Sequence, residues 1–208
     1  YVQYRTGAVF GGDRLDLTLL AEHDAWVHLT TQSATKISRS ENEAQARQRL
    51  HLDLGPGAYV ESLPDTLIPQ AGSRYRQDTE VDLEPGAMCV VAETVAPGRR
   101  AFGERFAFDR LELRTTVRAD GRELCVEQLC FEPTRASPAR PGILGDGDYL
   151  GTLMALAPDR DADTLATASD RSLRELEDRG CGGRAAAGTR PHGAGARAIA
   201  VAPDAPLA

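Results

Sequence analysis

Three glutamates lie among apolar side chains in segments with the pattern of β-strands. They are Glu61, which shares a strand face with Tyr59 and Leu63, Glu93, between Val91 and Val95, and Glu127, between Cys125 and Leu129. A carboxylate removed from water costs free energy unless it is paired, hydrated or protonated. Two interpretations follow. The glutamates form buried or edge ion pairs with some of the many arginines, or they mark a polar route through a β-sheet core along which carboxylates pass on a cation or a proton.

Other residues that could do chemistry form no recognisable active-site motif. No nucleophile-elbow pattern surrounds a serine, and the glycines from Gly7 to Gly12 are not followed by the Gly-Lys-Ser/Thr of a phosphate-binding loop. Histidines and cysteines show no HxH, HExxH or CxxC spacing, so we expect no strong metal site. The pattern predicts no catalytic residues. An open alternative is a β-solenoid carbohydrate hydrolase that uses Asp13 and one of the glutamates, although one tryptophan and 5% aromatic residues offer little for sugar stacking.

The elements that must position the glutamates are strands with one buried face. Apolar residues alternate with a period of two from Leu15 to about Phe131, and Gly, Pro and Asp mark the turns between runs. A degenerate repeat is visible in Ala25, Ala58 and Ala87, which are 33 and 29 residues apart in equivalent places after turns. The fold class predicted for residues 1–133 is therefore mainly β, an elongated, layered, solenoid-like sheet structure. A meander remains open because the repeat is degenerate.

The helix and strand signals in residues 134–208 predict a small α/β appendage on this β-rich core. We expect a helix at Asp161–Arg179, before the stop at Gly180, and strands at Gly151–Leu156 and Ala198–Val201. More than half of residues 179–208 are Gly or Ala. That composition predicts a mobile end, or an arm that orders on a partner.

Composition excludes several classes of partner. The net charge of −7 argues against a general nucleic-acid binder. The sequence contains no run of about 18 apolar residues, so we expect no membrane-spanning helix. Cys89, Cys125 and Cys130 lie in apolar runs, which predicts buried free thiols. A reduced, cytoplasmic setting is the expected location.

A polar signature opens the chain and continues through it. GGDRLDL (residues 11–17) contains the turn residues Gly11, Gly12 and Asp13, and LTTQSATKISRS (29–40) contains Thr30, Thr35 and the only lysine, Lys36. GAYVESLPDTLIP, YRQDTEVDLEPGA, AETVAPGRRAFGERF and DGRELCVEQL follow. In this order and spacing the pieces resemble the UreD (UreH) family of urease accessory proteins, from about Tyr4 to Leu129.

The resemblance implies a non-enzymatic assembly factor with a mostly β, layered fold and helices near the C-terminal end. It implies UreF-type and UreG-type (GTPase) partners and docking on apo-urease, with nickel passing through an internal tunnel. Carried over to this chain, the polar path positions are Asp13, Thr35, Glu61, Glu93 and Glu127. Carboxylates and water suit transient Ni(II), so no tightly bound cofactor is expected. A passive adaptor that never conducts nickel remains the alternative within the same family.

Overall fold

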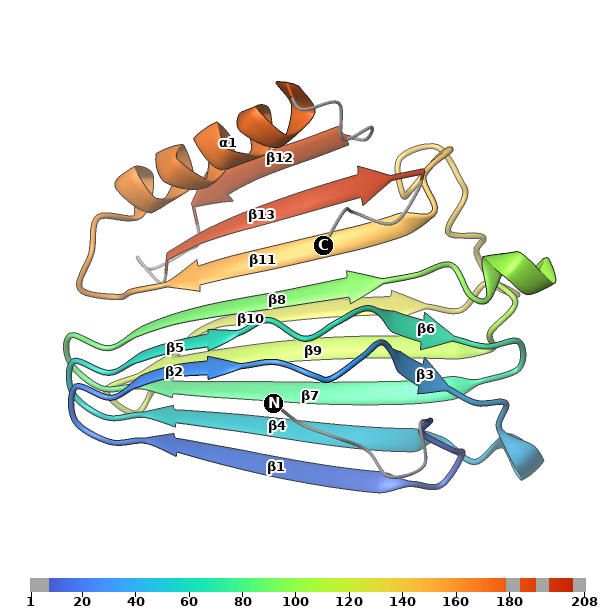
Figure 1. The fold of residues 1–208 in the computed structure, drawn as a ribbon, viewed down its shortest axis with the longest axis horizontal. Helices are drawn as coiled ribbons and strands as arrows, with labels where there is room; N and C mark the ends of the chain where they lie inside the picture. The colour runs from blue at the N-terminus through green and yellow to red at the C-terminus, as the bar shows by residue number, and fades with distance from the viewer. Residues whose placement is uncertain (1–7, 179–183, 190–194, 204–208) are drawn as a thin grey trace.

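The computed structural model describes residues 8–178, 184–189 and 195–203, which form two β-sheets stacked face to face (Figure 1). The five-stranded sheet has the order β1 (Arg14–Ala21), β4 (Ala46–Leu54), β7 (Arg74–Leu83), β9 (Arg110–Ala119) and β10 (Arg122–Phe131). The eight-stranded sheet has the path β12 (Arg184–Thr189), β13 (Gly195–Ala202), β11 (Tyr149–Leu156), β8 (Met88–Val95), β5 (Tyr59–Ser62) and β2 (Trp26–Leu29). Its remaining strands are β3 (Thr35–Ile37) and β6 (Leu67–Pro69), which pair with each other. The helices are η1 (Glu41–Glu43), η2 (Arg100–Phe102) and α1 (Ala162–Asp178).

The repeat in the sequence corresponds to successive turns of the solenoid. Trp26 pairs in parallel with Tyr59, and Tyr59 with Met88, one residue after each of the repeated alanines. The same offsets set the register of the other sheet, where Leu17 pairs with Leu50 and Leu50 with Thr79. The chain passes from a strand of one sheet to a strand of the other and back, and each new strand pairs in parallel with the strand one repeat earlier. Successive repeats therefore stack as coils, and the layered, solenoid-like β fold is confirmed.

Alternation along the strands builds the core between the two sheets. On β4 and β7 every second side chain points inward, and all of these except half-buried Gln48 are buried, including Leu52 and Val81 at 0% exposure. Val60 and Val91 face them from the eight-stranded sheet. The intervening residues of β4 and β7 are largely charged and lie on the outer face. A polar side chain that points inward between the two sheets lies among apolar ones, which makes it a candidate for function.

The C-terminal strands extend the same sheet. β11 pairs antiparallel with β8, β13 with β11, and β12 with β13, so the eight-stranded sheet continues past residue 133. The predicted strands and helix in this region are confirmed, and α1 lies against β12 and β13 (Figure 1). The domain boundary after residue 133 stays a prediction.

The C-terminal end, for which the composition predicts mobility, contains two strands in the parts that the structure describes, and its mobility stays a prediction. Arg184–Thr189 and Gly195–Ala202 are strands, because β13 pairs along its whole length with β11 and offers its other edge to β12. Backbone pairing has overridden a composition poor in strand-forming side chains. The rest of the predicted arm lies outside the described residues.

The predicted burial of the cysteine thiols holds for only one of the three cysteines that the structure describes. Cys89 is buried, Cys125 is half-buried and Cys130 is exposed. Cys125 and Cys130 are five residues apart on β10, and side chains an odd number apart on a strand point to opposite faces. In the part of the chain that the structure describes, no helix has the length and apolar character needed to cross a membrane.

Candidate functional site

Glu93 is the carboxylate that lies between the two sheets. It occupies the inward phase of β8 between buried Val91 and Val95, as predicted, and pairs with Thr152 of β11. Gln77 Nε2, from the opposite sheet, donates a 2.6 Å hydrogen bond to Glu93 Oε1. Burial raises the pKa of Glu93 to about 7, and the Gln77 hydrogen bond opposes that rise. The carboxyl group therefore changes its charge near neutral pH.

Two small cavities meet at Glu93. The first, the Asp65 cavity, has a volume of about 50 Å³. Its polar lining comprises Thr30, Thr31, Thr35, Gln48, Ser62, Asp65, Gln77, Glu93 and Thr94. The second, the Glu127 cavity, has a volume of about 30 Å³, and its polar lining comprises Glu93, Thr115, Glu127, Thr152 and Arg197. Each has several polar groups among apolar ones in its lining and is large enough to hold water, and Glu93 lines both.

A hydrogen-bonded row of amides supports Glu93 from the five-stranded sheet. The Tyr75 hydroxyl lies 2.8 Å from Gln48 Oε1 and 3.0 Å from Gln77 Oε1, and Gln77 Nε2 lies 3.4 Å from Thr79 Oγ1. Sequence reasoning missed these residues. Their signal was present, since Gln48, Gln77 and Thr79 occupy the same inward-facing positions of β4 and β7 as the apolar core residues.

In the Glu127 cavity, Glu127 forms an ion pair with Arg197 of β13. Both side chains are largely buried, and Thr115, which lines the same cavity, is 6% exposed. Sequence reasoning missed Arg197 because it lies in the Gly- and Ala-rich end. The ion-pair interpretation therefore describes Glu127, whereas Glu93 has a hydrogen bond and no ion pair among the described residues.

Glu61 does not belong to the interior, which corrects the expectation that it lies on a buried face. On β5 the inward residues are Val60 and Ser62, at 0% and 2% exposure, and Glu61 points outward. Its Oε1 accepts a 2.5 Å hydrogen bond from the Tyr59 hydroxyl, and its Oε2 lies 3.1 Å from His28 Nδ1. These two hydrogen bonds lower the pKa of Glu61. The prediction failed because an alternating pattern does not say which of the two faces is buried.

The Gly11–Asp13 signature forms a turn that lines neither cavity. Asp13 Oδ2 accepts a 2.9 Å hydrogen bond from Phe10 N, and Asp13 N donates back to Phe10 O at 3.0 Å. Gly12 has φ of +90°, and a Cβ on Gly11 would lie 2.8 Å from Ala44 O, so the turn requires both glycines. Lys36 has an exposed side chain on β3. Thr30, Thr35, Glu93 and Glu127 are thus brought to the cavities, and Asp13 and Glu61 are not.

Replacing Asp13 by alanine should reduce stability by about 1 kcal/mol, the usual contribution of one such hydrogen bond. Urea unfolding monitored by circular dichroism measures the change. The control is Asp16→Ala on the exposed face of β1, which should change the unfolding free energy little. Equal losses in the two variants would show that the Asp13 turn has no special role.

No group of three or more His, Cys, Asp and Glu side chains comes together as a metal site within the described ranges. The inward carboxylates, Glu93 and Glu127, lie on two different sheets and line one cavity together. Carboxylate oxygens and water are weak, exchangeable ligands for a divalent cation. The two glutamates therefore present such oxygens to one shared cavity, where Glu127 is paired with Arg197.

Comparisons with known proteins identify the family of this chain. A family model described as UreD urease accessory protein matches residues 1–205. A urease accessory protein UreD of Haloarcula marismortui is 35% identical over 195 residues, which are 94% of this chain and 63% of that protein. UreD 2 of Streptomyces griseus is 40% identical over 179 residues, covering 85% of this chain and 61% of that protein. A UreD of Mycolicibacterium gilvum is 35% identical over 205 residues, covering 99% of this chain and 72% of that protein.

The chain thus spans about three fifths of the first two relatives. The match to the family model is nevertheless continuous and includes both cavities. This chain belongs to the UreD family of urease accessory proteins.

Proposed function

We propose that this chain is a non-catalytic scaffold for urease maturation in the cytoplasm. It links UreF-type and UreG-type partners to apo-urease and helps Ni(II) reach the urease active site. The observation that carries the proposal is Glu93, a half-buried residue whose carboxyl group lines two cavities in the sheet core, each with several polar side chains in its lining. Membership of a family named for urease accessory proteins supports the direction of the assignment.

The route runs through the Asp65 cavity to Glu93 and on through the Glu127 cavity. With a pKa near 7, Glu93 is neutral in part of the molecules, which reduces the cost of a buried charge while no cation is present. An approaching dication favours the ionised form, so Glu93 loses its proton as the ion arrives. Two carboxylates and water release Ni(II) more readily than thiolates or imidazoles would.

Arg197 controls the exit of this route. Its guanidinium is paired with Glu127, so a cation must displace a like charge to reach that carboxylate. The ion pair therefore keeps the Glu127 cavity closed to cations until a partner moves β13 or supplies another acid. Asp13 and Glu61, which line neither cavity, take no part in the route.

The passive adaptor is the second candidate, and the Glu127–Arg197 ion pair is the observation that favours it. In an adaptor this pair simply stabilises the packing of β13 on β10. The hydrolase alternative needs Asp13 and a glutamate in one cleft. Asp13 instead caps its own turn, away from both cavities.

Omitting this protein from cells that contain the partners should leave urease synthesised but without nickel. The reason is that the scaffold joins the nickel-carrying partner to the apo-enzyme. Co-expression with UreF- and UreG-type proteins and apo-urease at limiting nickel, followed by urease activity and nickel content, measures the effect. Normal nickel content without the protein would exclude the scaffold function.

A further inference from the structure

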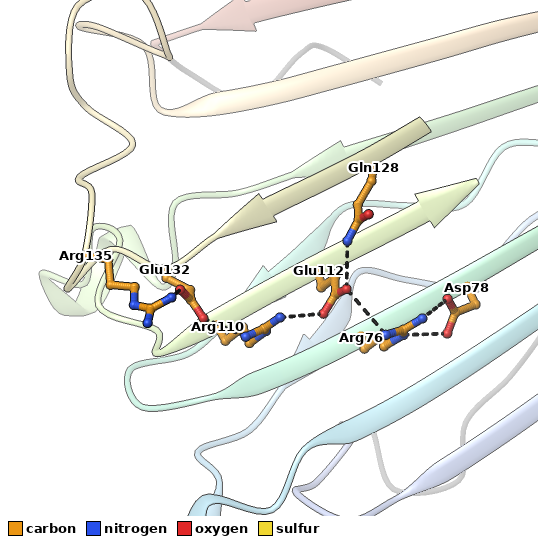
Figure 2. Close-up of polar contacts among 7 residues, drawn as sticks. All are labelled: Arg76, Asp78, Arg110, Glu112, Gln128, Glu132 and Arg135. Carbon is orange, nitrogen blue, oxygen red and sulfur yellow. Dashed lines mark hydrogen bonds and ion pairs between the residues drawn. The ribbon is translucent and has the colours of Figure 1, made fainter. Parts of the chain in front are cut away.

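The outer face of the five-stranded sheet carries a charged network that is internally balanced. Figure 2 shows it across β7, β9 and β10. Arg76 donates two hydrogen bonds to Asp78, at 2.8 and 2.7 Å, and Glu112 accepts from Arg110 at 3.0 Å. Three arginines, Arg76, Arg110 and Arg135, are matched by three carboxylates, Asp78, Glu112 and Glu132. A network with equal charges of both signs needs no further partner.

A groove beside this network is not balanced. It has a volume of about 250 Å³ and is lined by Arg49, Arg76, Asp78, Glu80, Arg114, Thr116 and Arg118. Arg76 is engaged by Asp78, and Arg118 Nη1 lies 3.2 Å from Glu80 Oε2. Arg49 and Arg114 remain, and neither has a carboxylate within ion-pair distance among the described residues. The groove therefore carries two excess positive charges on a chain whose net charge is −7.

The two arginines are held apart by the sheet itself. Arg49 of β4 pairs with Asp78 of β7, and Asp78 pairs with Arg114 of β9, so the three residues form one row across adjacent strands. With strands about 4.8 Å apart, the backbones of Arg49 and Arg114 are separated by about 10 Å. The Nε of Arg114 is buried and finds no hydrogen-bond partner in the described part of the chain, so this guanidinium has an unused donor.

We propose that this groove is a docking site for an acidic segment of a partner polypeptide, with carboxylates about 10 Å apart that pair with Arg49 and Arg114. Guanidinium groups match carboxylates through paired hydrogen bonds. The ionised Asp78 lies between the two arginines and repels a small anion at the centre of the groove, so the negative groups bind on either side of it. The groove lies on the opposite face of its sheet from Gln77 and the cavities, so the docking site does not depend on a nickel route.

Binding of a synthetic peptide with glutamate at every third position and alanine between, about 10 Å between successive glutamates in an extended chain, tests the docking site. The fluorescently labelled peptide is titrated with the full chain at about 50 mM salt, where screening is weak. We expect the double variant Arg49→Gln/Arg114→Gln to bind about tenfold more weakly than the parent, since two charge-assisted contacts are lost. The matched control is Arg171→Gln/Arg174→Gln on exposed positions of α1, which makes the same change in net charge. It should bind as the parent does, and a glutamine version of the peptide should not bind.

Three results would overturn the docking site. They are no binding of the glutamate peptide to the parent, equal weakening in both double variants, and complete displacement of the peptide by millimolar inorganic phosphate. The last would identify a small-anion site. Circular dichroism verifies folding, and if the double variant is unfolded, Arg49→Gln alone should weaken binding roughly threefold. Urease activation is a separate measurement, so failure here leaves the proposed scaffold function untouched.

Discussion

Replacement of Glu93 by alanine is expected to lower urease activation about tenfold, the effect of losing one contact of ~1.4 kcal/mol along the route. Assembly with the partners should be unchanged, because Glu93 lies between the sheets, where it accepts a hydrogen bond from Gln77 of the opposite sheet. Co-purification measures assembly, and nickel content with urease activity measures delivery. Both readouts are needed, since a folding defect would lower them together.

The outward glutamate provides a matched control for this substitution. Glu61→Ala removes the same side chain from the outer face, where it contacts only Tyr59 and His28 among the described side chains, and should leave activation unchanged. Glu127→Ala should impair activation as Glu93→Ala does, with assembly intact. Normal activation by both interior variants would favour the passive adaptor.

The stability of Glu93→Gln should exceed that of the parent at about pH 8 and equal it at low pH. The pKa of Glu93 is about 7 in the folded protein, against 4.5 for the unperturbed group. Between these values the folded state holds more protons than the unfolded state, so the parent loses stability as the pH rises through this range. At about 1.4 kcal/mol for each pH unit, the loss approaches 3 kcal/mol above pH 7. Glutamine does not ionise and retains an oxygen that can accept from Gln77, so its stability should not fall.

Urea unfolding of both proteins at several pH values between about 5 and 8 measures this difference. For a chain of this size the effect corresponds to a rise in Tm of roughly 5–10 °C at the upper pH. Glu61→Gln serves again as the control, since the pKa of Glu61 is lowered and its carboxylate is already ionised throughout this range. Parallel pH profiles for the parent and Glu93→Gln would show that Glu93 is hydrated or paired in solution.

The sequence by itself determined the strand alternation, the spacing of the repeat and the family. Alternation with a period of two requires a buried and an exposed face, and the intervals of 33 and 29 residues reappear as the pairing of Trp26 with Tyr59 and of Tyr59 with Met88. Glu93 could be placed in the interior because its neighbours two positions away, Val91 and Val95, belong to a long run of buried side chains. Local periodicity suffices for these features because strand geometry links each residue to its neighbours.

Only the tertiary structure decided which charges are compensated. On β5 the short alternating pattern fits either face, and packing against the other sheet turns Val60 inward and Glu61 outward. Glu127 meets Arg197 from a strand 70 positions away, and no local pattern predicts that encounter. The same holds for the outer groove, where Arg49 and Arg114 become neighbours of one aspartate through register alone. Charges interact through space, so their balance emerges when strands distant in sequence are brought side by side.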